Sequence, residues 1–111
     1  MDKRGRYREI VQRLIQEYAG YKPVNGQIES EAIIDRDQDH YEVMNVGWDG
    51  HRRVHGSVIH IDIQGEKVWI QHNGTNRLIA DELVDAGITK EDIVLGFHPP
   101  ELRRFSGFGE G

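Results

Sequence analysis

The first clear pattern in the chain is an apolar stripe at helical spacing near its start. The residues that recur at intervals of three and four are Tyr7, Ile10, Val11, Leu14, Ile15 and Tyr18. This recurrence is typical of an amphipathic helix with one face toward a core. Gly20 can end a helix in the left-handed conformation and Pro23 cannot continue one, so we expect the helix to end close to Ala19.

The middle of the chain changes to the period of two that is typical of β-strands. Strands are expected at residues 28–35, 41–48, 53–63 and 67–72, the first of them at a sheet edge. Asp49-Gly50 is a strong hairpin signal because both turn residues must accept positive φ, and Gly65-Glu66 supplies the next turn.

These turns predict the register, and the register assigns side chains to faces because neighbours on a strand point to opposite sides. The predicted cross-strand pairs are Ile63 with Val68, Ile61 with Ile70, and Ile59 with His72. The first hairpin places Met44, Val46 and Trp48 on that same side, which we interpret as the core face. The opposite face then carries Tyr41, Val43, Asn45, Val58, His60, Asp62, Trp69 and Gln71.

The last third of the chain predicts a second helix and an irregular end. Thr75 is a suitable N-cap for a helix over residues 78–84, and Gly87 can end it. An apolar run at residues 93–97 has no assigned type, and Pro99 and Pro100 stop it. The fold class is therefore α+β: an N-terminal helix, a four-stranded antiparallel sheet, a second helix and an irregular C-terminal segment in one domain, residues 1–111.

Composition narrows the class of protein. The chain has 14 Lys and Arg against 19 Asp and Glu, a net charge of −5, and no cysteine, so disulfides and thiolate chemistry are excluded. Basic residues gather at residues 3–13 and acidic ones at 29–39, a polarity that suits self-association as a homodimer or higher oligomer. No apolar run approaches the roughly 20 residues of a membrane span, and no secretory signal is visible, so we expect a cytoplasmic protein.

Histidines and carboxylates raise the question of catalysis or metal binding. His60, Asp62 and Gln71 could orient one another, and His72 lies one strand away. The predicted register places His60 and His72 on opposite faces, and no nucleophile elbow or phosphate loop surrounds them. We therefore expect no catalytic residue, no metal and no cofactor.

An acidic stretch before the second strand has the spacing of a calcium loop. Asp35, Asp37 and Asp39 alternate, but His40 replaces the required glycine and Val46 the closing glutamate. We expect a solvated, charged turn.

Two surfaces are candidates for binding a partner, because mixed polar and aromatic side chains are typical of interfaces. The first is the second sheet face, with Tyr41, Val43, His60, Asp62, Trp69 and Gln71. The second is the proline-broken segment Gly96, Phe97, His98, Pro99 and Pro100.

Several stretches together resemble one known family. They are Val58-Ile-His-Ile-Asp-Ile63, Lys67-Val-Trp-Ile-Gln-His72, Gly74-Thr75, Ala80-Asp-Glu-Leu83, Asp92-Ile-Val-Leu-Gly-Phe-His-Pro99 and the closing residues 103–108. Over nearly its whole length the chain resembles the XisI family of cyanobacterial DNA-element excision controlling factors.

The resemblance implies an accessory role in excising an element that interrupts the fdxN gene, with a companion protein called XisH and a separate recombinase that cuts the DNA. It implies no catalytic residue. We expect a non-catalytic factor that binds a XisH-like protein or a second copy of itself. A direct DNA-binding regulator is the alternative, and a hydrolase or nuclease using His60, Asp62 or His72 is a further one.

Overall fold

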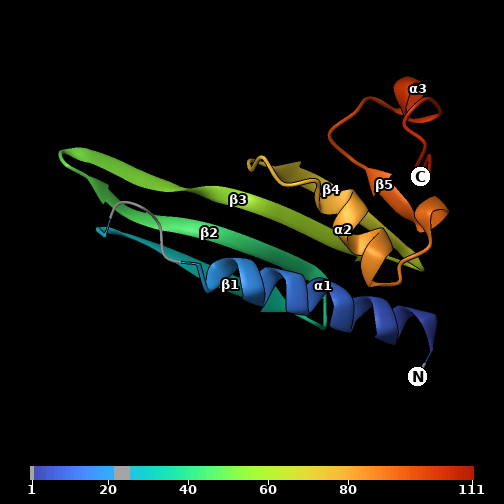
Figure 1. Ribbon diagram of the computed structural model, residues 1–111, viewed down its shortest axis with the longest axis horizontal. Coiled ribbons are helices and arrows are strands. Elements are labelled where there is room, and N and C mark those ends of the chain that lie inside the picture. Colours follow the sequence, from blue (N-terminus) through green and yellow to red (C-terminus); the bar gives the residue numbers. More distant parts are fainter. Residues whose placement is uncertain (1, 22–25) are drawn as a thin grey trace.

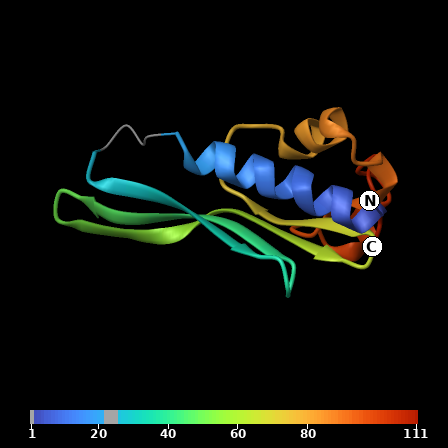
Figure 2. The ribbon, with the colours of Figure 1, turned by 90° about the horizontal axis from the view of Figure 1, so that it is seen from below.

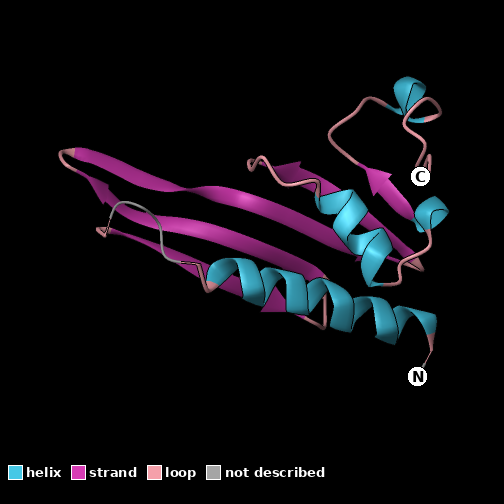
Figure 3. Cartoon of the chain, in the orientation of Figure 1, coloured by secondary structure: helices cyan, strands magenta, loops and turns pink. Residues whose placement is uncertain are grey.

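The computed structural model describes residues 2–21 and 26–111. Its elements are α1 (Lys3–Ala19), β1 (Ile28–Asp35), β2 (His40–Asp49), β3 (Arg52–Gln64), β4 (Lys67–Asn73), α2 (Ile79–Ala86), the 3₁₀ turn η1 (Lys90–Asp92), β5 (Ile93–Leu95) and α3 (Pro100–Arg103). The strands lie in the order β1-β2-β3-β4-β5, with β4 and β5 parallel and the other pairs antiparallel (Figure 1 and Figure 3). The α+β class is confirmed, but the sheet has a fifth strand and is mixed.

Helix α1 ends at Ala19, as the sequence predicts, and begins at Lys3, one turn before the apolar pattern that starts at Tyr7. The side chain of Asp2 accepts a hydrogen bond from the backbone N–H of Gly5 at 2.7 Å, which satisfies one of the free donors of the first turn. The helix ends at Ala19, although Gly20 has φ −76° and does not adopt the left-handed conformation. Pro23, the other expected stop, lies outside the described residues.

The core lies between one face of the sheet and the two longer helices, which run side by side across it (Figure 2). Helix α1 contributes Tyr7, Val11 and Ile15, each fully buried, and α2 contributes Ile79 and Leu83. The sheet contributes Tyr41, Val43, Ile59, Ile61, Ile63, Val68, Ile70 and Ile93. Each large apolar side chain buried in this way stabilises the fold by about 1.5–3 kcal/mol before entropy is counted, so this layer dominates the stability.

A β-bulge between β2 and β3 corrects the predicted faces. Val43 pairs with Ile59 but Met44 pairs with Ser57, so Val58 is an extra residue on β3. The hairpin closes one position later than expected, at Gly50 and His51. Tyr41 and Val43 therefore point into the core and are fully buried, which makes their assignment to the opposite face wrong.

A second bulge lies between β3 and β4. The predicted pairs Ile63 with Val68 and Ile61 with Ile70 are confirmed, but the next pair is His60 with His72, so one residue of β4, Gln71, is extra. The prediction that Ile59 pairs with His72, and that His60 and His72 lie on opposite faces, is wrong. Side-chain alternation cannot continue through a bulge.

The C-terminal third differs most from the prediction. The apolar run of uncertain type forms β5, and Val94 bridges to Gly109, which ties down the end of the chain. Helix α2 begins at Ile79, not after Thr75. The hydroxyl of Thr75 instead accepts a hydrogen bond from the backbone N–H of Arg77 at 3.1 Å, forming a local turn.

The hairpin of β2 and β3 projects beyond the end of α1 (Figure 1 and Figure 2). Trp48 and Arg53 pair near its tip, with the guanidinium 5.3 Å from the ring centre. Within the described ranges, no helix has both the length and the apolar character that a bilayer crossing requires.

Candidate functional site

Four neighbouring polar side chains of β2 and β3 form a cluster on the sheet face away from α1 and α2. In the β2–β3 ladder His40 pairs with Asp62 and Glu42 pairs with His60. These residues alternate with the buried Tyr41 and its neighbours, so the two histidines and two carboxylates share the other face. The register of β2 against β3 is therefore sufficient to bring these four side chains together.

Asp62 is the centre of this cluster and is only 7% exposed. One of its oxygens, Oδ1, lies 2.7 Å from Nδ1 of His40 and 2.9 Å from Nε2 of His60. Its other oxygen accepts a hydrogen bond from Nε2 of Gln71 at 3.2 Å. A carboxylate can only accept, so both imidazoles donate N–H groups to Asp62.

The cluster carries a charge-assisted bond. Burial alone would raise the pKa of Asp62, but the hydrogen bond from His40 and the charge and hydrogen bond of His60 outweigh it and lower that pKa. The hydrogen bond to Asp62 in turn raises the pKa of His40 above 6.5. The negative carboxylate and the protonated His40 stabilise each other.

The side chains of His40, His60 and Asp62 present ligand atoms suited to a metal ion. Within the described residues, one ligand atom from each of His40, His60 and Asp62 lies within 4.8 Å of the other two. His72 pairs with His60 across β3 and β4 but is exposed and is not part of this group.

A second charged cluster surrounds Asp39, which was expected in a solvated turn. Its side chain is 1% exposed and accepts hydrogen bonds from Arg4 at 2.9 Å and from Arg8 at 2.8 Å. The hydroxyl of Tyr41 donates to it at 3.0 Å. Burial and this bond raise the pKa of Tyr41 to about 12. The basic segment at residues 3–13 and the acidic segment at residues 29–39, whose charges favour self-association in the sequence, therefore contact each other within one chain.

The structure places the predicted interface residues in different environments. Tyr41 and Val43 are buried in the core and cannot touch a partner. Trp69 is partly covered, since the guanidinium of Arg103 lies 5.0 Å from its ring centre. His60, Asp62 and Gln71 belong to the polar cluster. The exposed candidates are Phe97, His98, Pro99 and Pro100, while Gly96 is half-buried.

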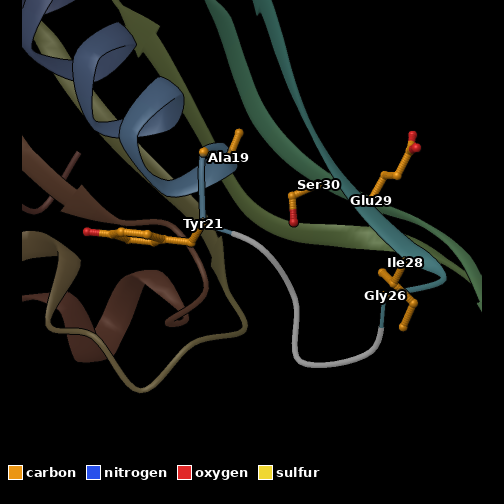
Figure 4. A pocket seen from close by; sticks show the side chains of 7 residues that line it. Ala19, Tyr21, Gly26, Ile28, Glu29 and Ser30 are labelled. Carbon is orange, nitrogen blue, oxygen red and sulfur yellow. The ribbon is translucent and has the colours of Figure 1, made fainter.

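Two of the pockets in the described part of the chain bear on ligand binding. A pocket of about 490 Å³ lies between the end of α1 and the start of β1, where Tyr21 and Glu29 point in different directions (Figure 4). Among the described residues of its lining, Glu29 is the one charged side chain, so these residues offer no convergent set of charged groups. A pocket of about 200 Å³ lies between the start of α2 and β5, and its apolar lining includes Leu78, Leu95 and Phe97.

The family to which this chain belongs follows from comparison with known protein families. A family model described as XisI protein matches residues 1–110. The chain belongs to the XisI family. No match to this XisI-family chain was found among curated proteins.

Two solved structures share the XisI fold. A XisI-like protein from Anabaena variabilis ATCC 29413 is 41% identical, with a TM-score of 0.90, over 95% of this chain and 96% of that one. The fdxN element excision controlling factor XisI from the same organism is 36% identical, with a TM-score of 0.86, over 99% of this chain and 100% of that one. The resemblance predicted from sequence is confirmed, and the relative is named as a controlling factor.

Sequence reasoning found part of the polar cluster in this XisI-family chain. His60, Asp62 and Gln71 were placed on one face, but His40 was assigned to a turn and missed. The available signal was the pair of motifs His40-x-Glu42 and His60-x-Asp62 on adjacent strands. Only the observed register, with its bulge, brings the two motifs opposite each other.

Proposed function

We propose that this chain is a controlling factor in the excision of a DNA element and that it acts by binding another protein rather than by catalysis. Its membership of the XisI family supports the role, because a 36% identical relative carries the name fdxN element excision controlling factor. The cutting of DNA then belongs to a separate recombinase.

The observation that carries the binding mechanism is a set of four exposed apolar side chains in the last third of the chain. Of the exposed large hydrophobic side chains, Leu78 is 70% exposed, Phe97 49%, Leu102 50% and Phe105 72%. We call these four residues the C-terminal apolar surface. Aromatic side chains that stay exposed in a monomer are typical of interface cores.

Local structure holds this surface in place. Leu78 and Phe97 line the same apolar pocket of about 200 Å³. The short helix α3 is tied back to the preceding segment, since Nε of Arg103 donates to the carbonyl oxygen of His98 at 3.0 Å. The surface is therefore presented by ordered backbone, which lowers the entropic cost of binding.

A XisH-like protein is the proposed partner. The guanidinium groups of Arg103 and Arg104 lie 5.0 and 4.8 Å from the ring centres of Trp69 and Phe105, so the surface also carries two positive charges, which suits a partner with acidic as well as apolar side chains. A second copy of the chain would be the competing occupant, and the experiment below separates the two.

The test is co-expression of the chain with a XisH-like protein, followed by size-exclusion chromatography. Phe97→Ser and Phe105→Ser should each abolish co-elution, because anchors of this kind commonly contribute 2 kcal/mol or more, about 30-fold in affinity. The matched control is Trp48→Ser, which removes a 48% exposed aromatic side chain at the far end of the hairpin. It should leave the complex intact.

Other outcomes count against the proposal. Co-elution that survives both phenylalanine variants would move the interface elsewhere. A chain that runs as a dimer alone, and that both variants convert to a monomer, would identify the second copy as the occupant of this surface.

A second candidate function, direct DNA binding, is favoured by the projecting hairpin. Arg52 and Arg53 are exposed near its tip, and a two-stranded ribbon fits the major groove. Binding to element-end DNA should then weaken steeply as salt rises, and Arg52→Ala with Arg53→Ala should reduce the salt slope by about two. A salt-independent or absent mobility shift would contradict this function.

A further inference from the structure

We propose that His40, His60 and Asp62 form a binding site for one divalent transition-metal ion of the zinc type. This site goes beyond the proposed role in partner binding, because it lies on the open sheet face and uses none of the C-terminal apolar surface.

The donors converge from two strands. Nδ1 of His40 and Nε2 of His60 lie 2.7 and 2.9 Å from the same oxygen of Asp62, and all three donor atoms lie within 4.8 Å of one another. Tetrahedral zinc with bonds of about 2.0–2.1 Å separates neighbouring donors by about 3.3 Å. The two nitrogen–oxygen pairs must therefore open by only about half an ångström to admit the ion, and the two nitrogens, which lie within 4.8 Å of each other, must reach the same separation of about 3.3 Å.

The side chains that must move can do so. The side chain of His40 is 57% exposed and that of His60 is 32% exposed, whereas Asp62 is held at 10%. The carboxylate can stay in place while the two imidazoles rotate outward.

The surroundings of the donors resemble those of known metal sites. Metal-bound histidines usually pass their other ring N–H to a carboxylate, and bound carboxylates are themselves hydrogen-bonded. Oε1 of Glu42 lies 4.0 Å from Nδ1 of His60, the nitrogen that does not face Asp62. Gln71 donates to the second oxygen of Asp62 at 3.2 Å.

The donor types select the class of ion. Two imidazole nitrogens and one carboxylate oxygen are preferred by zinc and its first-row neighbours, whereas calcium and magnesium prefer oxygen ligands throughout. Such an ion would link β2 and β3 directly, on the sheet face that α1 and α2 leave uncovered.

The test is isothermal titration of the purified chain with Zn²⁺ at pH 7.5, with Co²⁺ absorption as a second readout of coordination. We expect one saturable site with a dissociation constant in the micromolar range or lower, and an increase of several degrees in Tm on binding. His40→Ala should weaken binding at least about tenfold, and His60→Ala likewise. His40→Ala also removes the hydrogen bond from His40 to Asp62, so its own melting temperature without metal is the reference against which the loss of the Zn²⁺-induced shift is measured.

The matched control is His55→Ala, an exposed histidine on the same strand as His60 but opposite Val46. It should leave affinity and stoichiometry unchanged. Glu42→Gln should weaken binding only modestly. The proposal is overturned if Zn²⁺ shows no saturable binding below about 100 μM, or if His40→Ala and His55→Ala bind the ion equally well. Loss of partner binding has no bearing on this result.

Discussion

Removing the buried charge of Asp39 should destabilise the chain by an amount that its pKa predicts. Burial alone would raise the pKa of Asp39, but hydrogen bonds from Arg8, Arg4 and Tyr41 outweigh it and lower the pKa from 3.8 to about 2. Each pKa unit corresponds to about 1.4 kcal/mol, so the ionised carboxylate contributes about 2.5 kcal/mol at neutral pH. For a domain of this size that is a substantial part of the total stability.

The substitution Asp39→Asn isolates the charge. Asp39 has φ +58°, a left-handed conformation that asparagine tolerates better than other side chains, so backbone strain stays the same. The amide also keeps an oxygen that can accept the Tyr41 hydroxyl. The matched control is Asp37→Asn, an exposed position on the same turn, which should change stability by less than about 0.5 kcal/mol.

Urea unfolding, followed by circular dichroism from pH 7 to pH 2, measures the effect. Because the folded-state pKa lies below the unfolded-state value, the contribution is complete above about pH 5 and is lost as the pH falls toward 2. The difference between wild type and Asp39→Asn should therefore shrink from about 2.5 kcal/mol at pH 7 to under about 1 kcal/mol at pH 2. A difference that is near zero at pH 7, or that does not change with pH, would refute the reasoning.

Two further predictions concern the hydrogen bonds that Asp62 and Asp92 accept. NMR titration should give His40 a pKa above 6.5, and this pKa should fall in Asp62→Asn. Because the pKa of His40 is higher in the folded state than in the unfolded state, the pair of His40 and Asp62 stabilises the fold below pH 6.5. This contribution is lost as the pH rises through the folded-state pKa. Tyr7→Phe removes a buried hydroxyl that donates to Asp92 at 2.6 Å, and urea unfolding should show a loss of about 1–3 kcal/mol, against less than 0.5 kcal/mol for the exposed Tyr21→Phe.

Elements with strong local signals could be predicted from the sequence. The buried face of α1 and its end at Ala19 follow from local signals, and β1 lies at residues 28–35 as expected. The turn at Gly65 and Glu66 is also as predicted, because φ at Gly65 is +63°, a left-handed conformation that glycine adopts far more readily than other residues. In each case the deciding interactions lie within a few residues of one another.

Features that depend on distant contacts could not be predicted in this way. Alternation gave Tyr41 and Val43 the wrong face because the bulge at Val58 has no signature in a single sequence. Strand β5 has three residues, too few to show a period. The same bulge hid the opposition of His40 and Asp62, so the polar cluster could be recognised only in part.

The two edges of the sheet determine how copies of this chain can assemble. At one edge the Val94–Gly109 bridge occupies β5, so the end of the chain blocks strand addition there. The other edge, β1, is unpaired in the described sheet but exposes Glu29 and Glu31, and two such edges would repel each other when paired. Open-ended growth by strand addition is thus obstructed at both edges. The polar face can stay exposed without turning the sheet into a template for fibres.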